Sequence, residues 1–495
     1  MGLCKGGLSR LPARYFVDAP GMSAPHPAMT SSAPVETTAA PAPRLLVGAL
    51  GLVVLIVAVL QTAIVPALGA VASQLNEPAV SVSWAVTANL LAAAAATPLI
   101  GRLADLRNKK RVLLWVLALV LAGSLLAALT SSLPLLVVGR MLQALAFSLY
   151  PVAVSIVRDE LPPARLVRSI AVISAMLGFG GGFGLVVTGL LMTQGASYHR
   201  VFWFCSAVTA LALAVAWVVI PNRPRFVRAK IDWVGAAALA AGLAALLLGI
   251  TEGSRWGWTS PRILISVAIG LAVMRWWWSW SQRCPDPLVS VAILRRRPIL
   301  LGNIATLFVG MGLYFSFLGT TGFVEAPVGS GYGFDASVLD ASVEFLLPGA
   351  LAAAVTALVA GRYIERFGPR VVIAAGAGAG AFGFTALTLW HTHPWQIVVA
   401  GLFTNAYISL AYGALPVLVL QSGVADDETG IATSLNAVFR KVGSAIAAAM
   451  FAGVEKPAAD GHIPEGAFIA IFAAGAVTAL AVMLMALSRH SVQGT

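Results

Sequence analysis

Long apolar runs, separated by short polar segments, dominate the hydrophobic pattern of this chain. A helix rises about 1.5 Å per residue, so a run of roughly 20 residues crosses a hydrocarbon core of about 30 Å. Fourteen runs are long enough, at residues 45–71, 81–101, 112–131, 133–157, 169–195, 201–221, 232–251, 261–281, 298–324, 337–360, 371–390, 394–421, 430–454 and 466–487. In lipid, backbone N–H and C=O groups need partners within the segment, and a helix supplies them. The pattern therefore predicts an all-α polytopic membrane protein with about 14 transmembrane helices.

Composition agrees with this class and argues against others. Of the 495 residues, 59% are hydrophobic and 11% are charged, and the mean hydropathy is +0.88. Soluble domains carry roughly 25% charged residues, so a soluble fold of this length is excluded. The three cysteines, Cys4, Cys205 and Cys284, lie far apart without paired spacing, which argues against a disulfide framework or a cysteine metal site.

The basic residues predict an orientation. A net charge of +12 is compatible with nucleic-acid binding, but these residues form short clusters between apolar runs. With the N-terminus in the cytoplasm, 24 Lys and Arg residues fall in cytoplasmic segments, four in outer loops and four within helices. This bias follows the positive-inside rule. It predicts an integral plasma (inner) membrane protein with both termini cytoplasmic, anionic lipids at its cytoplasmic face and no nucleic-acid partner.

A repeated turn divides the chain. Gly101-Arg-Leu-Ala-Asp105 and Gly361-Arg-Tyr-Ile-Glu365 each end an apolar run and precede basic residues and the next run. Two similar halves of this kind are common among secondary transporters. The N-terminal segment is rich in Pro, Ala, Ser and Thr and lacks helical periodicity, which is typical of disorder. We expect a disordered cytoplasmic tail at 1–43, a six-helix bundle at 44–221, an inserted helix pair with cytoplasmic linkers at 222–297, a second six-helix bundle at 298–488 and a cytoplasmic C-terminus at 489–495.

Six motifs carry a resemblance to a known family. They are Gly101-Arg102-Leu-Ala-Asp105 with Arg107, Lys109, Lys110 and Arg111; Arg140-Met-Leu-Gln143; the glycines Gly178, Gly180, Gly184 and Gly189; Gln61-Thr-Ala-Ile-Val65; Ile231-Asp-Trp233; and Arg440-Lys-Val-Gly443. With them, residues 45–455 resemble the major facilitator superfamily, and within it the fourteen-helix drug:proton antiporter family. The resemblance implies a major facilitator fold and proton-coupled export of small amphipathic or drug-like molecules by alternating access, without ATP or a cofactor.

Five positions depart from the family's pattern. Gln61 stands where many relatives have an acid, Asn108 and Ala144 replace glycines, and Leu185 and Thr188 replace the Pro and a Gly of the antiporter motif. Losing that proline removes an expected helix kink. An importer or uniporter on the same fold therefore stays open as an alternative, and a non-transporting membrane scaffold or sensor is the second.

Charged side chains within apolar runs are costly in lipid, which makes them functional candidates. Arg140 lies about six residues into its helix, with Gln143 one turn later on the same face. The resemblance implies that Arg140 couples protonation to substrate movement; the alternative is a structural arginine bonded to backbone carbonyls. Arg440, one turn after Asn436, is a candidate for a cavity or ion-pair role, with a purely structural role as the alternative.

Carboxyl groups are the candidates for proton binding. Asp340 and Glu344 are four residues apart and share a helix face, with Glu344 expected roughly 10 Å below the outer end. Burial there would suit Glu344 to bind a proton near neutral pH. The alternative places Asp340 and Glu344 in a hydrated outer vestibule together with Glu325. For Asp105, the resemblance implies a gate that latches the two halves on the cytoplasmic face.

Two further sets complete the predicted site. We expect a midplane substrate cavity to be lined by Gln61, Asn89, Gln143, Asn303, Glu325 and Asn405, although a lone Asn or Gln can also be an interhelical contact. We expect conformational roles for Gly101, Arg102, Arg107, Lys109, Arg111, Gly361, Glu365, Gly178, Gly184 and Gly189.

Other motifs argue against catalysis. Gly378-Ala-Gly-Ala-Phe-Gly383 matches a dinucleotide fingerprint but lies inside an apolar run without a preceding strand, so close helix packing explains it. No Lys is followed by Ser or Thr, so a Walker A loop is absent. The histidines lack metal-ligand spacing and no nucleophile–base set appears, so we expect neither an enzyme nor a metal site.

Overall fold

The computed structural model describes residues 42–488, except 65–66, 83, 193–195, 224–230, 290, 423, 425–427 and 455–462. These residues belong to one compact unit. Almost all of the predicted tail and the whole predicted C-terminus at 489–495 lie outside the described residues.

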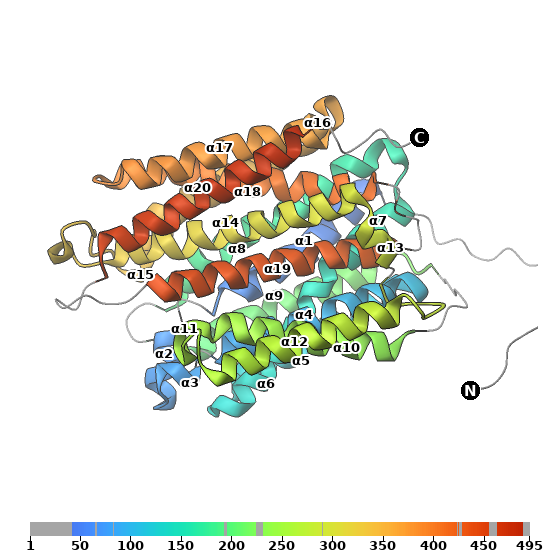
Figure 1. The fold of residues 1–495 in the computed structure, drawn as a ribbon, viewed down its shortest axis with the longest axis horizontal. Helices are drawn as coiled ribbons and strands as arrows, with labels where there is room; N and C mark the ends of the chain where they lie inside the picture. Colours follow the sequence, from blue (N-terminus) through green and yellow to red (C-terminus); the bar gives the residue numbers. More distant parts are fainter. Residues whose placement is uncertain are drawn as a thin grey trace, which may run out of the picture. The chain divides into compact units, whose positions relative to one another are not determined.

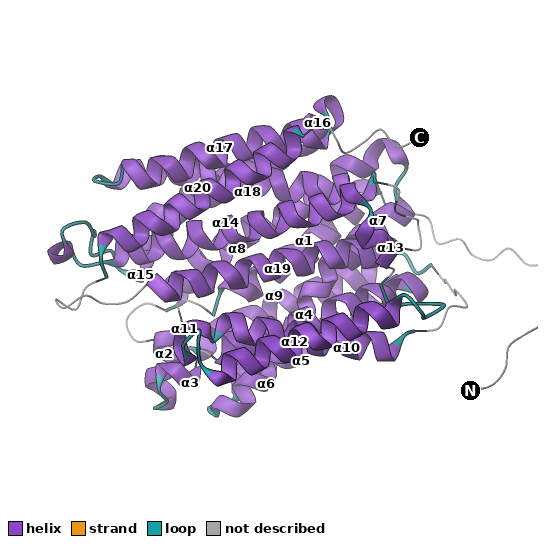
Figure 2. Ribbon diagram, in the orientation of Figure 1, coloured by secondary structure: helices purple, strands orange, loops and turns teal. Residues whose placement is uncertain are grey.

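Among the described residues, fourteen helical spans are long and apolar enough to cross a membrane, as predicted. They are α1 (Pro43–Thr62), α4 (Trp84–Leu106), α5 (Lys109–Leu129), α6 (Leu133–Gln143) continued by η1 (Ala144–Ser148) and α7 (Leu149–Glu160), α8 (Pro163–Leu191), α9 (His199–Val219), α10 (Trp233–Thr251), α12 (Pro261–Ser281), α14 (Arg297–Glu325), the π-helical η4 (Ala341–Leu346) continued by α16 (Leu347–Phe367), α17 (Pro369–Leu389), α18 (Pro394–Leu420), α19 (Thr429–Val454) and α20 (Glu465–Leu487). Short helices connect them: α2 (Leu68–Leu75), α3 (Ala79–Val82), α11 (Gly253–Trp256), α13 (Val291–Arg295), η3 (Val328–Ser330) and α15 (Val338–Asp340). The described residues contain no strand (Figure 2), so the all-α membrane fold is confirmed.

Two predicted runs are interrupted. The run at 45–71 divides into α1, which ends at Thr62, and α2, which begins at Leu68. The run at 337–360 contains the π-helical turn η4 directly before Pro348, which lies in the first turn of α16. Proline has no N–H to donate to the carbonyl four residues earlier, so the hydrogen-bond ladder is broken at that point.

The spans pack as two groups that meet along a shared seam. Among α1 to α9, here called the first bundle, α1 packs on α8 and α9, and α5 packs on α6 and α9. Among α14 to α20, the second bundle, α17 packs on α18 and α20, and α14 packs on α19 (Figure 1). The bundles meet where α8 contacts α16 and α18, and where α19 contacts α4 and α7. The pair α10 and α12 pack on each other, and α10 also contacts α4 and α19.

Glycines permit the closest approaches along this seam. A Cβ at Gly101 of α4 would collide with Ser434 and with the Gly430 carbonyl of α19. A Cβ at Gly361 of α16 would lie 2.8 Å from the Arg168 Cα of α8. The two repeated turns of the sequence therefore place their glycines at equivalent contacts, each against the opposite bundle.

Candidate functional site

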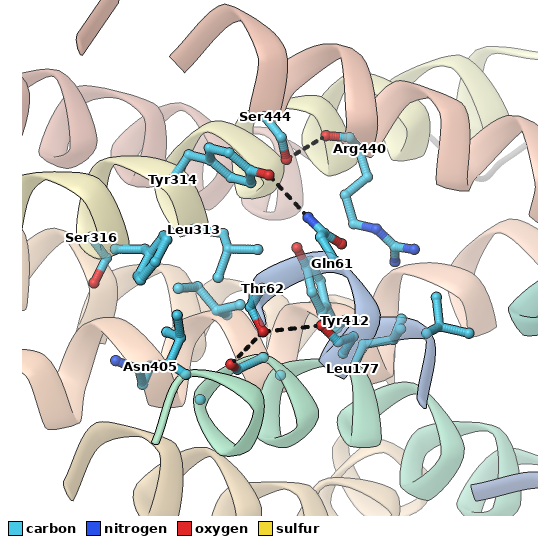
Figure 3. Close-up of a pocket in the computed structure, with 18 of the residues that line it drawn as sticks. Gln61, Thr62, Leu177, Leu313, Tyr314, Ser316, Asn405, Tyr412, Arg440 and Ser444 are labelled. Atoms are coloured by element: carbon cyan, nitrogen blue, oxygen red, sulfur yellow. Dashed lines mark hydrogen bonds between the residues drawn. The ribbon is translucent and has the colours of Figure 1, made fainter. Parts of the chain in front are cut away.

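A cavity of about 80 Å³ lies between the two bundles. Helices α1 and α8 line it from the first bundle, and α14, α18 and α19 line it from the second (Figure 3). Its polar lining residues are Gln61, Thr62, Tyr314, Ser316, Asn405, Tyr412, Arg440, Lys441 and Ser444. The other lining residues are apolar or glycine. Ligand sites for drug-sized molecules are roughly 300–1,000 Å³, so the cavity is contracted in this conformation.

Hydrogen bonds across the cavity join the helices that line it. Gln61 of α1 donates its Nε2 to the Tyr314 Oη of α14 at 3.1 Å. Thr62 donates its Oγ1 to the Gly181 carbonyl of α8 at 2.9 Å (Figure 3). Asn405 bonds within its own helix, to the Gly401 carbonyl at 3.0 Å. Gln61 therefore bridges the two bundles, so its predicted place on the cavity wall is also an interhelical contact.

Two neighbouring cations of α19 face the cavity. Arg440 and Lys441 are buried, with 7% and 5% of their surface exposed. The Arg440 Cζ lies 4.9 Å from the Tyr412 ring and 5.3 Å from the Tyr150 ring, and the Lys441 Nζ lies 3.6 Å from the Phe147 ring. Aromatic faces attract cations and so offset part of the cost of burying these charges.

Close backbone packing holds this part of α19 in place. A Cβ at Gly310 of α14 would collide with the Arg440 carbonyl, so glycine is required for the two helices to approach there. Ser444 donates its hydroxyl to the carbonyls of Arg440 at 3.1 Å and Gly310 at 3.3 Å. The Arg440 side chain extends from this fixed backbone toward Gln61 (Figure 3).

The sequence pattern predicted a role for Arg440 but none for its neighbour Lys441. Lys441 lies within an apolar run, and the cost of intramembrane charge is a signal that applies equally to it. Tyr412 and Phe147 have no comparable signal, because an aromatic residue in an apolar helix is ordinary packing until its neighbours are known.

Arg140 occupies a different environment, away from the cavity wall. Its guanidinium donates to the Leu60 carbonyl at 3.0 Å, the Ala85 carbonyl at 3.3 Å and the Gln143 Oε1 at 2.6 Å. Asn89 donates to the Arg140 carbonyl at 2.7 Å. This is the arrangement expected of a structural arginine bonded to backbone carbonyls, and it joins α1, α4 and α6.

Four of the six predicted cavity residues do not line the cavity; Gln61 and Asn405 do. Asn89 and Gln143 support Arg140, and Gln143 also donates to the Ser124 hydroxyl at 2.9 Å. Asn303 is buried and accepts from Asn436 at 3.2 Å. Glu325 is half-buried at the end of α14. Asn89, Gln143 and Asn303 thus form hydrogen bonds within the protein, as in the alternative that a lone Asn or Gln is an interhelical contact.

The expected burial of Glu344 is wrong in this structure. Its side chain is exposed and does not line the cavity, because the π-helical turn before Pro348 changes the helix register. Asp340 is also exposed, and accepts from the Ser337 hydroxyl at 2.6 Å. Neither acid is buried in this structure; their place in a hydrated outer vestibule stays a prediction.

Asp105 joins the two bundles at the N-terminal end of α19. Its carboxylate is fully buried and accepts the backbone N–H groups of Gly430 at 2.9 Å and Ile431 at 3.0 Å. The Ser155 hydroxyl of α7 donates to it at 3.3 Å. A carboxylate is stabilised at a helix N-terminus by the free N–H groups and the helix dipole. Asp105, on α4, therefore caps a helix of the opposite bundle.

The other residues of the two repeated turns lie near Asp105 or near Glu365, the equivalent acid of the second turn. Lys109 pairs with Asp159 at 2.6 Å, while Arg107 and Arg111 are exposed and Arg102 is half-buried. Glu365, the counterpart of Asp105 in the second repeat, is exposed. The two repeated turns thus share their glycine contacts but differ in the burial of their acids.

The antiporter-motif glycines lie along α8. Gly184 packs against Val59 of α1, where a Cβ would lie 3.0 Å from the Val59 Cα. Gly178 and Gly189 face the second bundle, near Ser409 and Ser342 respectively. The helix α8 therefore uses glycine on the sides that meet both bundles.

Metal binding has no support in the described part of the chain. A search of these residues for three or more His, Cys, Asp or Glu side chains that could hold a metal ion finds none.

Comparisons with known proteins identify a family model and several relatives that match this chain. A model of the Major Facilitator Superfamily matches residues 50–448. The tetracenomycin C resistance and export protein of Streptomyces glaucescens is 28% identical over 82% of this chain and 74% of its own length. The uridine/deoxyuridine transporter of Lactococcus lactis is 26% identical over 77% of this chain and 80% of its own length.

Some matches are shorter, and one is structural. The chain spans 57 to 72% of the length of the uncharacterised MFS-type transporters from Bacillus subtilis and Mycobacterium tuberculosis that match it. The crystal structure of the human organic anion transporter MFSD10 (TETRAN) covers 90% of this chain and 100% of its own, with a TM-score of 0.62. At 18% sequence identity, that likeness concerns the fold alone.

Proposed function

Because the chain belongs to the Major Facilitator Superfamily, we propose that it is a secondary active transporter that exports small amphipathic molecules in exchange for protons. The observation that carries the proposal is the cavity between the two bundles, which both bundles line. A site at such an interface can be exposed to either side as one bundle rocks against the other. The export function named for the Streptomyces relative supports the proposed direction.

In this proposal Asp105 is the cytoplasmic latch. The carboxylate holds the N-terminus of α19 to α4, so breaking these bonds accompanies opening of the cytoplasmic side. A contact made in one state only shifts the equilibrium toward that state. In the proposed orientation both termini are cytoplasmic, and the exposed Arg107 and Arg111 near Asp105 face the anionic lipid head groups of the inner leaflet.

Flux into liposomes tests the transport proposal. The purified protein is reconstituted, a pH gradient is imposed, and three amphipathic dyes with anionic, neutral and cationic head groups are followed. We expect gradient-driven movement of at least one dye, absent from protein-free liposomes and abolished by a proton uncoupler. If none of the dyes moves with the gradient, proton-coupled export of amphipaths is the wrong function.

Carboxyl variants in the same assay test the gate and the proton site. We expect Asp105→Asn to lower coupled flux about tenfold, because charge-assisted bonds to α19 are weakened. Glu365→Gln is the matched control, since this exposed acid holds the equivalent place in the second repeat, and it should transport normally. Glu344→Gln should also retain coupling; a loss of coupling would restore Glu344 as the proton site.

Uptake is the second candidate. The altered α8 motif, with Leu185 in place of proline, favours it. The direction of flux under opposite gradients in the same liposomes separates uptake from export.

A further inference from the structure

We propose that the substrates carried in this cavity are amphipathic organic anions, an inference that rests on the proposed transport function. An acidic head group (carboxylate, sulfonate or phosphate) binds at Arg440, Lys441 and Tyr412, here called the anion site. The apolar body of the substrate lies against the apolar walls formed by Leu177, Leu313 and Phe317.

The first argument is the charge of the cavity wall. Arg440 and Lys441 are its charged residues, and no Asp or Glu of the described part of the chain lines it. Neither cation forms an ion pair within 4.0 Å with a described carboxylate. The wall therefore carries two basic side chains and no described carboxylate.

The second argument is that the buried acids are engaged elsewhere. Among the described residues, the buried carboxylates are Asp105, Asp232 and Glu252. Asp105 caps α19, and Asp232 accepts from the backbone of Gly235 at 2.7 Å and from the Trp280 Nε1 at 3.1 Å. Glu252 accepts from Thr87 at 3.4 Å. None of these three acids belongs to the cavity wall.

The third argument is a set of donors that lack acceptors. The Lys441 Nζ and the Tyr412 hydroxyl are buried, and neither has a hydrogen-bond partner among the described residues. The Arg440 guanidinium lies over the Tyr412 ring and has aromatic contacts in place of an acceptor. Leaving buried donors unsatisfied is costly. All three groups reach the same cavity, so a ligand that brings acceptor oxygens satisfies them together.

These features select against cations as well as for anions. An arginine and an ammonium offer charge-assisted hydrogen bonds to an acidic oxygen pair, and arginine can bind it through two N–H groups. A cationic head group in the same place would meet two like charges in a low-dielectric site. The apolar walls then reward a substrate whose remainder is hydrophobic.

Ligand-induced thermal stabilisation of the purified full chain in detergent tests the proposal independently of transport. Three probes share one apolar ring system and differ in charge: 1-naphthoate, 1-naphthamide and 1-naphthylmethylammonium. We expect 1-naphthoate to raise Tm in a saturable way, with an affinity at least about tenfold higher than that of the other two. Equal shifts from all three, a preference for the ammonium probe, or no shift from naphthoate overturns the anion inference, whereas proton-coupled flux is decided by the liposome assay alone.

Two tyrosines of α18 provide a matched pair of variants. Tyr407 and Tyr412 are both buried with unpartnered hydroxyls, but only Tyr412 lines the cavity. We expect Tyr412→Phe to leave the Tm of the ligand-free protein unchanged or raised and to weaken naphthoate binding several-fold. Tyr407→Phe should leave naphthoate binding unchanged; equal binding losses in the two variants would refute the anion site.

Removing one charge gives the larger effect. Lys441→Met keeps an unbranched side chain of similar length and should weaken naphthoate binding at least about tenfold. Arg275→Gln, which removes an exposed cation of α12 outside the cavity, is the control and should bind normally. Wild-type naphthoate affinity in Lys441→Met would contradict the proposal.

Discussion

Arg140 and Arg440 are buried arginines in membrane-spanning helices of opposite bundles, yet their surroundings differ. Arg140 donates to two backbone carbonyls and to the Gln143 amide. Arg440 lies over two aromatic rings and faces the cavity beside Lys441. Hydrogen bonds within the protein offset the cost of burying the Arg140 charge. At Arg440, aromatic contacts offset only part of that cost. Of the two arginines, Arg440 is therefore the one whose guanidinium is available to a ligand in the cavity.

The largest expected effect separates the two arginines by stability. We expect Arg140→Gln to destabilise the fold by on the order of 3 kcal/mol, because it leaves buried carbonyls without donors. Arg440→Gln should leave stability nearly unchanged, since no described acceptor is left unsatisfied, but should abolish naphthoate stabilisation. Thermal unfolding of both variants in one detergent measures this, with Arg275→Gln as the surface control. Equal losses of stability would erase the distinction between the two sites.

An acid introduced into the cavity tests whether the charge of the wall selects the ligand. We expect Gln61→Glu to lower naphthoate affinity about tenfold, because the new carboxylate offsets one of the two positive charges of the wall. The ammonium probe should bind the variant better than it binds the wild type. The shifts in Tm with both probes measure the change. Gln61→Met removes the bond to Tyr314 without adding charge, and a similar result from this control would show that charge is not the cause.

The smallest effect concerns the supporting amides. We expect Asn89→Ala to cost about 1 kcal/mol, because it removes the donor to the Arg140 carbonyl between helices. Asn405→Ala should cost less, since Asn405 bonds only within its own helix. Unfolding in detergent compares the two variants; a larger loss of stability at Asn405 would contradict the assignment of Asn89 as the support of Arg140.

The structure also shows which site features could be predicted from residue patterns and which could not. The positions of Asp105 and Gly101 follow from one motif, and the structure places both at α19. Glu344 was expected to be buried because of its depth below the outer end of a regular helix, but it is exposed and lies in the π-helical turn before Pro348. Lys441 lacked any motif role of its own, and its importance appears only once Phe147 and the cavity are seen around it.

By itself the sequence determined the class of this protein and the fourteen spans found among its described residues. Those features depend on local hydrophobicity and on spacing along the chain, which lipid and backbone hydrogen bonding translate directly into helices. Only the tertiary structure decided which buried charges are satisfied and which face the cavity. A hydrogen-bond partner such as the Leu60 carbonyl for Arg140 lies 80 residues away, and no local pattern records the absence of an acceptor. The burial of Arg140 and Arg440 follows from their place in apolar runs, whereas the packing of distant helices decides whether their charges have hydrogen-bond partners.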